Sequence, residues 1–190
     1  MFCSKNFKRV TLSVAALIAL LGQSIEAAFT ESLQYDRKLP SLTASEAYRR
    51  LLKGWRVDNL GLPLIPHPKI IEFGDPETGV GFILERDPPP GGLREGIVDG
   101  KCDGETCEMV YKVLNPGWTT FPLEAHRGTV TFHNDTEGCS MQWKVEWTPL
   151  SLTWVPFWDD FVRLLITATI SSAVTYVCRG DPKYGAQPDL

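Results

Sequence analysis

Apolar and polar residues alternate along much of the middle of the chain, with the period of two that is typical of half-buried strands. Strands of this kind are predicted at residues 69–73, 80–86, 93–99, 108–114, 123–133 and 140–148. Turn-like connections rich in Gly, Pro, Asn and Asp separate them. Because successive strands joined by short turns pair with each other, the pattern predicts an antiparallel meander. Residues 32–37 are a candidate for one further strand before it.

The same alternation assigns the faces of the predicted strands. In the last strand the apolar side, which should be buried, consists of Met141, Trp143, Val145 and Trp147. Two polar residues stand on otherwise apolar faces. Glu95 lies between Leu93 and Ile97, and His126 shares a face with Val130 and Phe132. Either these two make internal contacts, with Arg86 or Arg127 pairing with Glu95, or they carry chemistry.

Two segments have helical patterns instead. Thr43 followed three residues later by Glu46 is a capping box, which predicts a helix from there to about Trp55. The second segment, residues 157–178, is nearly apolar and follows Pro156, a residue suited to the first helical turn. This second segment either crosses a membrane or packs along a sheet.

Polar positions within the long apolar segment favour packing. Asp159 and Asp160 suit the start of a helix, and Arg163 is placed to pair with Asp159. A thin polar stripe follows every four residues, at Arg163, Thr167, Ser171 and Thr175. The apolar stripe predicted to face inward is Trp158, Phe161, Leu165 and Ala168. Residues 162–178 are short and polar for a membrane span, so we expect no stable span there.

The N-terminal region has the pattern of a secretory signal. Lys5, Lys8 and Arg9 precede an apolar run at residues 10–22, and cleavage is predicted after Ala27. An uncleaved anchor is the alternative, and Ala28-Phe29 also resembles the junction of bipartite plastid signals. We therefore expect residues 1–27 to be a signal, 28–42 an extended segment, 43–178 one domain, and 179–190 a flexible tail. The expected location is secreted or luminal.

The composition narrows the partners. The net charge is −4 and no basic stripe occurs, which disfavours nucleic acid. No cofactor or metal motif is found, so none is predicted, and a monomer is expected. Asn134-Asp135-Thr136 is a glycosylation sequon.

Cysteines indicate an oxidising compartment. Cys102 and Cys107 flank a predicted hairpin turn and are either disulfide-bonded or free thiols. If the long helix doubles back along the last strand, Cys178 comes close to Cys139, because both elements are about 30 Å long. We therefore predict a second disulfide between Cys139 and Cys178.

The order of helix, meander and long C-terminal helix resembles the helix-grip fold of the START-like superfamily (SRPBCC), which includes polyketide cyclase/dehydrase domains. The α+β fold that this implies is a curved antiparallel sheet of six or seven strands wrapped around the C-terminal helix. The resemblance rests on the order and spacing of residues 79–81, 93–95, Tyr111, Pro122, 127–130 and Trp143.

The resemblance implies an apolar cavity between sheet and helix that binds a lipid, sterol, isoprenoid or polyketide. Candidate ligand-binding residues are Met109, Tyr111, Trp118, Phe121, Trp143, Trp158, Phe161 and Leu165. A cyclase or dehydratase is the alternative, with Glu95 as acid or base and His126 or Tyr111 as its partner. A third possibility is a luminal interaction protein without ligand. A cavity below about 300 Å³ would weaken both ligand hypotheses.

Overall fold

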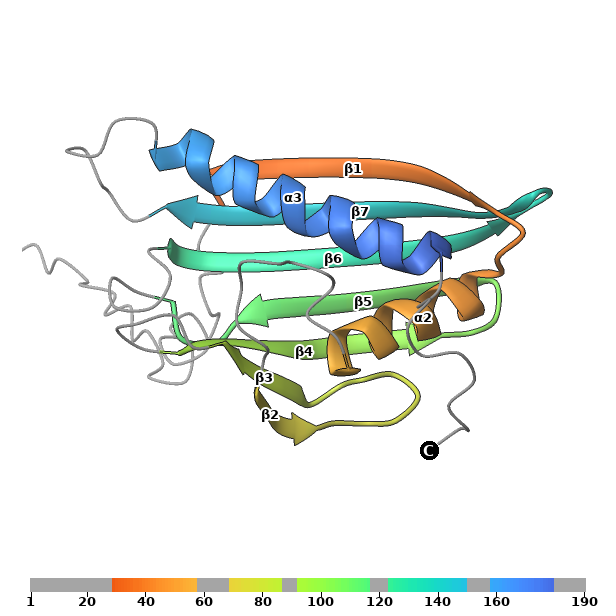
Figure 1. Ribbon diagram of the computed structural model, residues 1–190, viewed down its shortest axis with the longest axis horizontal. Coiled ribbons are helices and arrows are strands. Elements are labelled where there is room, and N and C mark those ends of the chain that lie inside the picture. Colours follow the sequence, from red (N-terminus) through yellow and green to blue (C-terminus); the bar gives the residue numbers. More distant parts are fainter. Residues whose placement is uncertain (1–28, 58–68, 87–91, 117–122, 150–157, 180–190) are drawn as a thin grey trace, which may run out of the picture.

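One antiparallel sheet dominates the structure, a computed structural model that describes residues 29–57, 69–86, 92–116, 123–149 and 158–179. Its strands lie in the order β1-β7-β6-β5-β4-β3-β2 (Figure 1). Their bounds are β1 Glu31–Pro40, β2 Lys69–Phe73, β3 Phe82–Arg86, β4 Leu93–Cys102, β5 Thr106–Val113, β6 Leu123–Asp135 and β7 Gly138–Pro149. The predicted meander is confirmed, because β2 to β7 pair in chain order.

The first strand is longer than the candidate segment that the sequence offered. β1 pairs with β7 along its whole length, from Glu31 opposite Trp147 to Pro40 opposite Gly138. Only Leu33 and Tyr35 contribute partly buried apolar side chains to the core from the middle of the strand. The alternation is weak because β1 is an edge strand, and β7 supplies the hydrogen bonds that hold it.

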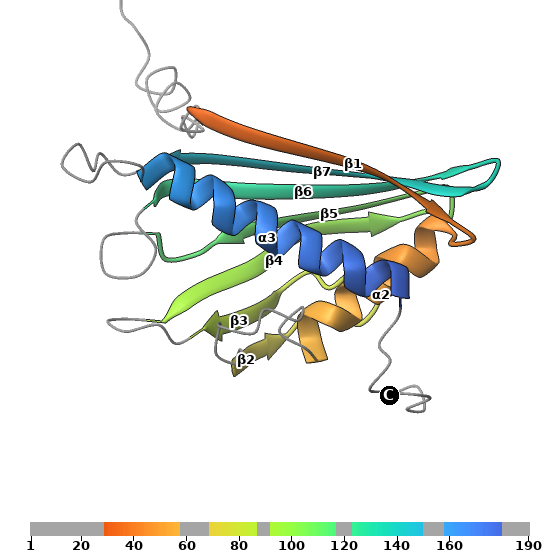
Figure 2. The same cartoon turned by 45° about the horizontal axis from the view of Figure 1, so that its top comes forward.

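The two helices within the described residues cover the same face of the sheet (Figures 1 and 2). α2 (Ala44–Val57) packs on β5 and β6, and α3 (Trp158–Arg179) crosses the sheet diagonally toward the start of α2. The predicted cap is present, since the Thr43 hydroxyl accepts the Glu46 N–H at 3.2 Å. Arg50 of α2 donates to the carbonyl of Val177 at 3.1 Å, which ties the two helices together. The helix-grip architecture is confirmed.

The buried face of α3 differs from the predicted one. Its core side chains recur every three or four residues, at Val162, Ile166, Ile170, Ala173, Val174 and Val177. Phe161 is 48% exposed and Leu164 is 65% exposed. The helix is apolar on nearly every side, so its pattern did not identify the inner face. The thin stripe of Thr167, Ser171 and Thr175 does face solvent, as predicted.

Arg163 has a partner that the sequence did not suggest. Its guanidinium pairs with Glu31 of β1 and lies 5.3 Å from the ring centroid of Trp147. The side chain of Asp159, the expected partner, lies outside the described residues. The arginine therefore fastens the first turns of α3 to the edge of the sheet.

Length and hydropathy alone would allow α3 to cross a membrane. Residues Asp160–Arg179 include an 18-residue window of mean hydropathy 1.6, of which 33% is buried in this fold. The buried share belongs to the face that packs on the sheet.

One predicted disulfide is present and the other is not. Cys102 and Cys107 are bonded across the β4–β5 hairpin, as predicted. Cys139 and Cys178 are free thiols, so the predicted second disulfide is wrong for this structure. Cys139 is buried beside Leu39, whereas Cys178 follows the last core residue Val177 by one position and so faces solvent.

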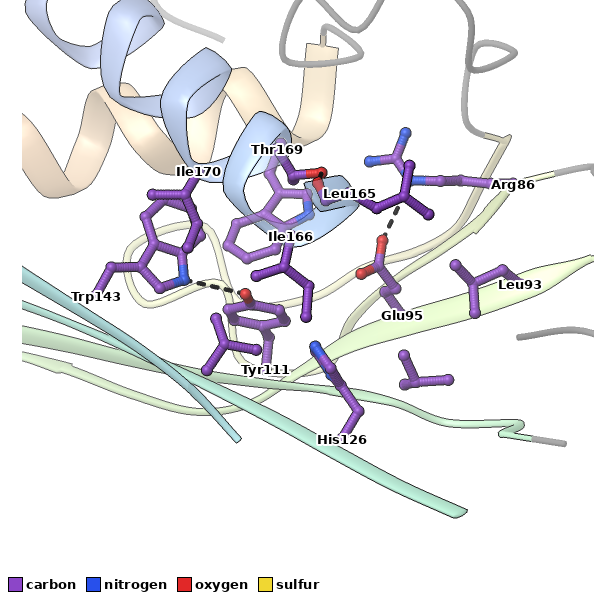
Figure 3. A pocket seen from close by; sticks show the side chains of 13 residues that line it. Arg86, Leu93, Glu95, Tyr111, His126, Trp143, Leu165, Ile166, Thr169 and Ile170 are labelled. Carbon is purple, nitrogen blue, oxygen red and sulfur yellow. Dashed lines mark hydrogen bonds and ion pairs between the residues drawn. The ribbon is translucent and has the colours of Figure 1, made fainter. Parts of the chain in front are cut away.

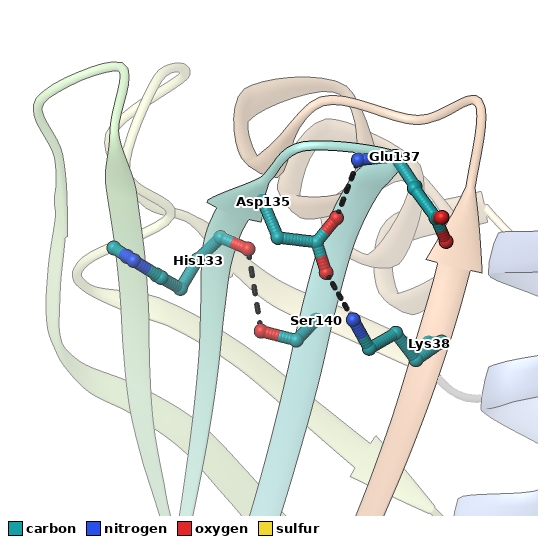
Figure 4. A network of polar contacts seen from close by, with 5 residues as sticks. All are labelled: Lys38, His133, Asp135, Glu137 and Ser140. Atoms are coloured by element: carbon teal, nitrogen blue, oxygen red, sulfur yellow. Dashed lines mark hydrogen bonds and ion pairs between the residues drawn. The ribbon is translucent and has the colours of Figure 1, made fainter.

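Polar contacts organise the β6–β7 turn (Figure 4). Asp135 accepts the Glu137 N–H at 2.9 Å and the Lys38 ammonium at 2.8 Å, which connects β1 to the turn. The Lys38 hydrogen bond, followed by that of Glu137, lowers the pKa of Asp135. The Ser140 hydroxyl donates to the carbonyl of His133 at 3.4 Å.

Candidate functional site

A cavity of about 130 Å³ lies between α3 and the sheet (Figure 3). Its lining is mainly apolar, and α3 contributes Leu165, Ile166, Thr169 and Ile170. Trp55 closes it from α2. Figure 3 shows Tyr111, Glu95 and His126 rising from the sheet toward the helix. Most polar side chains of the site therefore come from the strands, and α3 contributes mainly apolar side chains that cover the cavity.

Tyr111 is the best-held polar group of the cavity. Its hydroxyl accepts the indole N–H of Trp143 at 3.0 Å, and the Trp55 ring packs edge-on at 4.6 Å between centroids. Burial raises the pKa of Tyr111 well above its usual value, so the phenol is neutral and keeps its proton for donation. Gly128 lies opposite Tyr111 on β6, and a Cβ there would overlap the Tyr111 ring.

Glu95 forms an ion pair with Arg86, one of the two partners that the sequence suggested. The Arg86 Nε lies 3.2 Å from the Glu95 carboxylate, and the two side chains are 7% and 18% exposed. A second pair joins the same two strands, in which Arg94 lies 2.6 Å from Glu85 with its own side chain 53% exposed. The Arg86–Glu95 pair therefore places opposite charges beside an apolar cavity, while the Arg94–Glu85 pair is more exposed to solvent.

His126 brings an unsatisfied nitrogen to the site. Its Nδ1 is buried and has no hydrogen-bond partner among the described residues. The ring lies 5.5 Å from that of Tyr111. Burial lowers the pKa of His126, and the nearby Glu95 carboxylate opposes that shift only in part. A neutral imidazole at neutral pH follows, able to exchange a hydrogen bond or a proton with a bound molecule.

Not every candidate ligand-binding residue reaches the cavity. Tyr111, Trp143 and Leu165 line it, as do the acid–base candidates Glu95 and His126. Met109 is buried in the core elsewhere, and Phe161 lies half-exposed. Trp118, Phe121 and the side chain of Trp158 lie outside the described residues.

Sequence reasoning missed several lining residues. Trp55 was read only as the end of a helix, although it contacts both Tyr111 and Trp143. Ile166 and Ile170 were missed with the inner face of α3. Their four-residue spacing with Val162 was the available signal, hidden by equally apolar neighbours.

The sequon residue Asn134 has a structural role at the other end of β6. Its side-chain oxygen accepts the Ala44 N–H at the start of α2, at 2.7 Å. Its side-chain nitrogen donates to the carbonyl of Gly104 in the β4–β5 turn, at 2.8 Å. Both ends of the amide are therefore in use.

The polar groups of the cavity can donate and accept hydrogen bonds. Within the described part of the chain, no group of three or more His, Cys, Asp or Glu side chains is placed to hold a metal ion. The cavity offers one neutral phenol, one neutral imidazole and one ion pair in an apolar surround. A pocket of this kind binds a mostly apolar molecule and orients it through few polar contacts.

Solved structures with the same fold support the architecture. The di-domain aromatase/cyclase StfQ of the steffimycin biosynthetic pathway matches with a TM-score of 0.53 and 17% identity, over 77% of this chain and 50% of that one. Norcoclaurine synthase from Thalictrum flavum matches with a TM-score of 0.54 and 13% identity, over 92% and 96%. Ara h 8.0201 matches with a TM-score of 0.53 and 14% identity, over 77% and 97%.

These likenesses define the fold. The chain has the same helix-grip fold as these proteins, and it spans half the length of the di-domain cyclase. No protein-family model matches the sequence, and no curated protein matches it either.

Proposed function

We propose that this protein binds a small, mostly apolar molecule in the cavity between α3 and the sheet. The observation that carries the proposal is the buried Nδ1 of His126, which lacks a partner beside an apolar space. A buried polar atom without a hydrogen bond costs free energy that a ligand can recover. The Tyr111 hydroxyl lines the same space and offers a donor.

Cavity size limits what fits without rearrangement. About 130 Å³ is below the roughly 300 Å³ at which typical ligand pockets begin. By the criterion given above, this weakens both the binding and the cyclase hypothesis for a whole lipid, sterol or polyketide. An engineered apolar cavity of about 150 Å³ holds benzene, so one ring is the appropriate scale. The norcoclaurine synthase structure contains dopamine and hydroxybenzaldehyde, each with a single ring.

Blocking the cavity tests the binding proposal. Leu165→Trp should fill the space, and Leu164→Trp places the same side chain on the exposed face one position away. Calorimetric titration with benzyl alcohol should show binding to the wild type and to Leu164→Trp, and loss of at least about tenfold in affinity in Leu165→Trp. Equal affinity in the two variants would contradict the cavity as the binding site. Native mass spectrometry of protein from its own source would identify the bound molecule.

A second candidate function is proton-transfer catalysis, for which the supporting observation is that a neutral His126 lines the same cavity as the carboxylate of Glu95. His126 would take a proton from the bound molecule, and the Tyr111 hydroxyl would donate a hydrogen bond to the oxygen that gains charge. Exchange of the α-protons of phenylacetone for deuterium, followed by NMR, measures this activity. Wild type should exceed buffer, and both His126→Asn and Glu95→Gln should lose the excess, with His133→Asn as control. An unchanged rate in His126→Asn would remove it as the base.

We also infer entry into the secretory pathway, with cleavage after Ala27. The Cys102–Cys107 disulfide supports an oxidising compartment, where such bonds persist. N-terminal sequencing of the mature protein tests the cleavage site, and a start at Ala28 is expected. Localisation of a tagged full chain to a plastid would favour the bipartite alternative.

A further inference from the structure

The side of α3 that faces away from the sheet carries a regular stripe of exposed residues. They recur at intervals of three, four, three, four and three positions, at Phe161, Leu164, Ala168, Ser171, Thr175 and Cys178. This spacing is the heptad pattern by which one helix packs lengthwise on another. The stripe lies opposite the buried residues Val162, Ile166 and Ile170, so packing on the sheet leaves it on the surface. We call these exposed residues the outer seam.

Large and small side chains are separated along the outer seam. Phe161 and Leu164, which are 48% and 65% exposed, lie in its first half. Its second half ends in the smaller Ser171, Thr175 and Cys178. Because the spacing reads the same in both directions, an antiparallel second copy sets Leu164 against Thr175 and Phe161 against Cys178. A parallel copy sets Leu164 against Leu164 and leaves small residues facing each other. Shape therefore favours the antiparallel arrangement.

Charges at the two ends of α3 favour the same orientation. Asp160 is exposed directly before the outer seam, and Arg179 is exposed directly after it. Antiparallel packing brings Asp160 of each copy to the end that carries Arg179 of the other copy, whereas parallel packing brings like charges together. Charge complementarity of this kind determines orientation more than it determines affinity.

A second copy suits the outer seam better than a lipid surface does. Helices that lie on bilayers carry bulky apolar side chains beside basic ones. Half of the outer seam is instead small and partly polar, and the acidic Asp160 adjoins its bulky end. The Thr175 hydroxyl already donates to the Ser171 carbonyl at 2.8 Å, so a protein surface can cover it without leaving a buried donor unsatisfied.

We propose that two copies of this chain form a dimer with two-fold symmetry by packing their α3 helices antiparallel along the outer seam. Two-fold dimers use the same patch on both subunits and are the commonest homo-oligomers. The opposite face of α3 lines the cavity through Leu165 and Ile166, so the two cavities lie on opposite sides of the helix pair. This dimer departs from the monomer expected from the sequence, and it does not depend on the proposed ligand.

The oligomeric state tests the proposal directly. Sedimentation of the purified protein between about 1 and 100 µM should show a reversible monomer–dimer equilibrium, because small interfaces are weak. Leu164→Glu should raise the Kd of the dimer at least about tenfold. Leu114→Glu changes a leucine that is 43% exposed after β5, and as the matched control it should dimerise like wild type. A monomer at every concentration would overturn the dimer, and binding of that monomer to phosphatidylcholine vesicles, lost in Leu164→Glu, would assign the outer seam to lipid.

Cysteine cross-linking distinguishes antiparallel from parallel packing. Cys178 is an exposed free thiol, and Phe161→Cys places a second thiol opposite it in the antiparallel dimer. Treatment of Phe161→Cys with oxidised glutathione should give a covalent dimer in which peptide mapping finds position 161 linked to position 178. Adding Cys178→Ser should remove this link. Links that join position 161 to 161, or 178 to 178, would overturn the antiparallel arrangement.

Charge reversal tests the orientation independently. Asp160→Arg and Arg179→Asp should each raise the Kd of the dimer about fivefold, and the double variant should return to within about twofold of wild type. Each reversed charge is unfavourable at its own end of the helix, so recovery in the double variant comes from the other copy. Double-variant affinity as weak as that of the single variants would overturn the antiparallel orientation.

Discussion

The two ends of β6 are built in opposite ways. At the Asp135 end the side chains of Asn134 and Asp135 each hold two groups, which join α2, β1 and the hairpin turns. At the Leu123 end the strand parts from β5, and His126 presents a buried nitrogen without a described partner. At the Asp135 end the polar side chains stabilise the fold through hydrogen bonds. At the Leu123 end the His126 nitrogen is available to a ligand beside an apolar space.

This contrast separates structural polarity from functional polarity within a single strand. Asn134 and His126 both looked like functional candidates in the sequence, one as a glycosylation site and the other as an acid–base group. The structure distinguishes the two residues by their contacts. The Asn134 amide already makes hydrogen bonds through its oxygen and its nitrogen, whereas the His126 imidazole can form a further hydrogen bond with a ligand.

The largest expected effect comes from breaking the ion pair beside the cavity. Glu95→Ala leaves the Arg86 guanidinium buried without this carboxylate, which should lower the free energy of unfolding by about 3 kcal/mol. Glu85→Ala breaks the other ion pair between the same strands and should cost less than about 1 kcal/mol, because the Arg94 side chain is largely exposed. Urea denaturation measures both. Similar losses in the two variants would show that the inner pair is as well solvated as the outer one.

A smaller loss is expected at the opposite end of β6. Asn134→Ala leaves the Ala44 N–H and the Gly104 carbonyl without their partner, at a cost of about 2 kcal/mol. Gln142→Ala, an exposed amide on β7, is the control and should stay close to wild type. Thermal and urea unfolding report the difference. A wild-type value for Asn134→Ala would mean that water replaces both bonds.

The pH dependence of stability should reveal the buried imidazole. Because burial lowers the pKa of His126 in the folded state, the unfolded chain binds more protons, and stability falls as pH drops below the ordinary value of 6.5. His126→Asn should lose less stability between pH 7.5 and pH 5.5 than wild type does. Parallel curves for the two proteins would show that the imidazole titrates normally.

The smallest effect concerns Asp135, whose pKa is lowered mainly by Lys38. Lys38→Met should raise that pKa toward the ordinary 3.8, as followed by NMR of the carboxyl carbon. In wild type the stability from this pair is present above pH 3.8 and is lost as pH falls through the lowered pKa. Lys144→Met removes a different surface pair and should leave Asp135 unchanged.

The strands and α2 could be predicted because their patterns are local. Alternation placed Trp143 and Val145 in the core, and the capping box located the start of α2. The inner face of α3 could not be read, since Phe161 and Leu164 are as apolar as the core residue Ile166. The pairing of Arg163 with Glu31 joins positions far apart in the chain and leaves no local signal.

The cavity itself was only partly predictable. Glu95 and His126 stood out as polar residues on apolar faces, and the structure places both at the cavity. Its size depends on how Trp55 packs against Tyr111, a contact between a helix and a strand that no local pattern encodes. The point at which β5 and β6 stop pairing, at Lys112 opposite Arg127, is likewise not encoded by the alternation of apolar and polar residues.

Gly128 has a consequence for anyone who wishes to redesign the cavity. Because Gly128 has no side chain, the Tyr111 ring can occupy the space beside it. The side-chain volumes at positions 111 and 128 therefore depend on each other. Most substitutions of residue 111 alone replace Tyr by a smaller side chain and enlarge the space, whereas any side chain at residue 128 displaces the Tyr111 ring. Paired libraries, with small residues at 111 allowed alongside larger ones at 128, would explore differently shaped binding sites on an intact sheet.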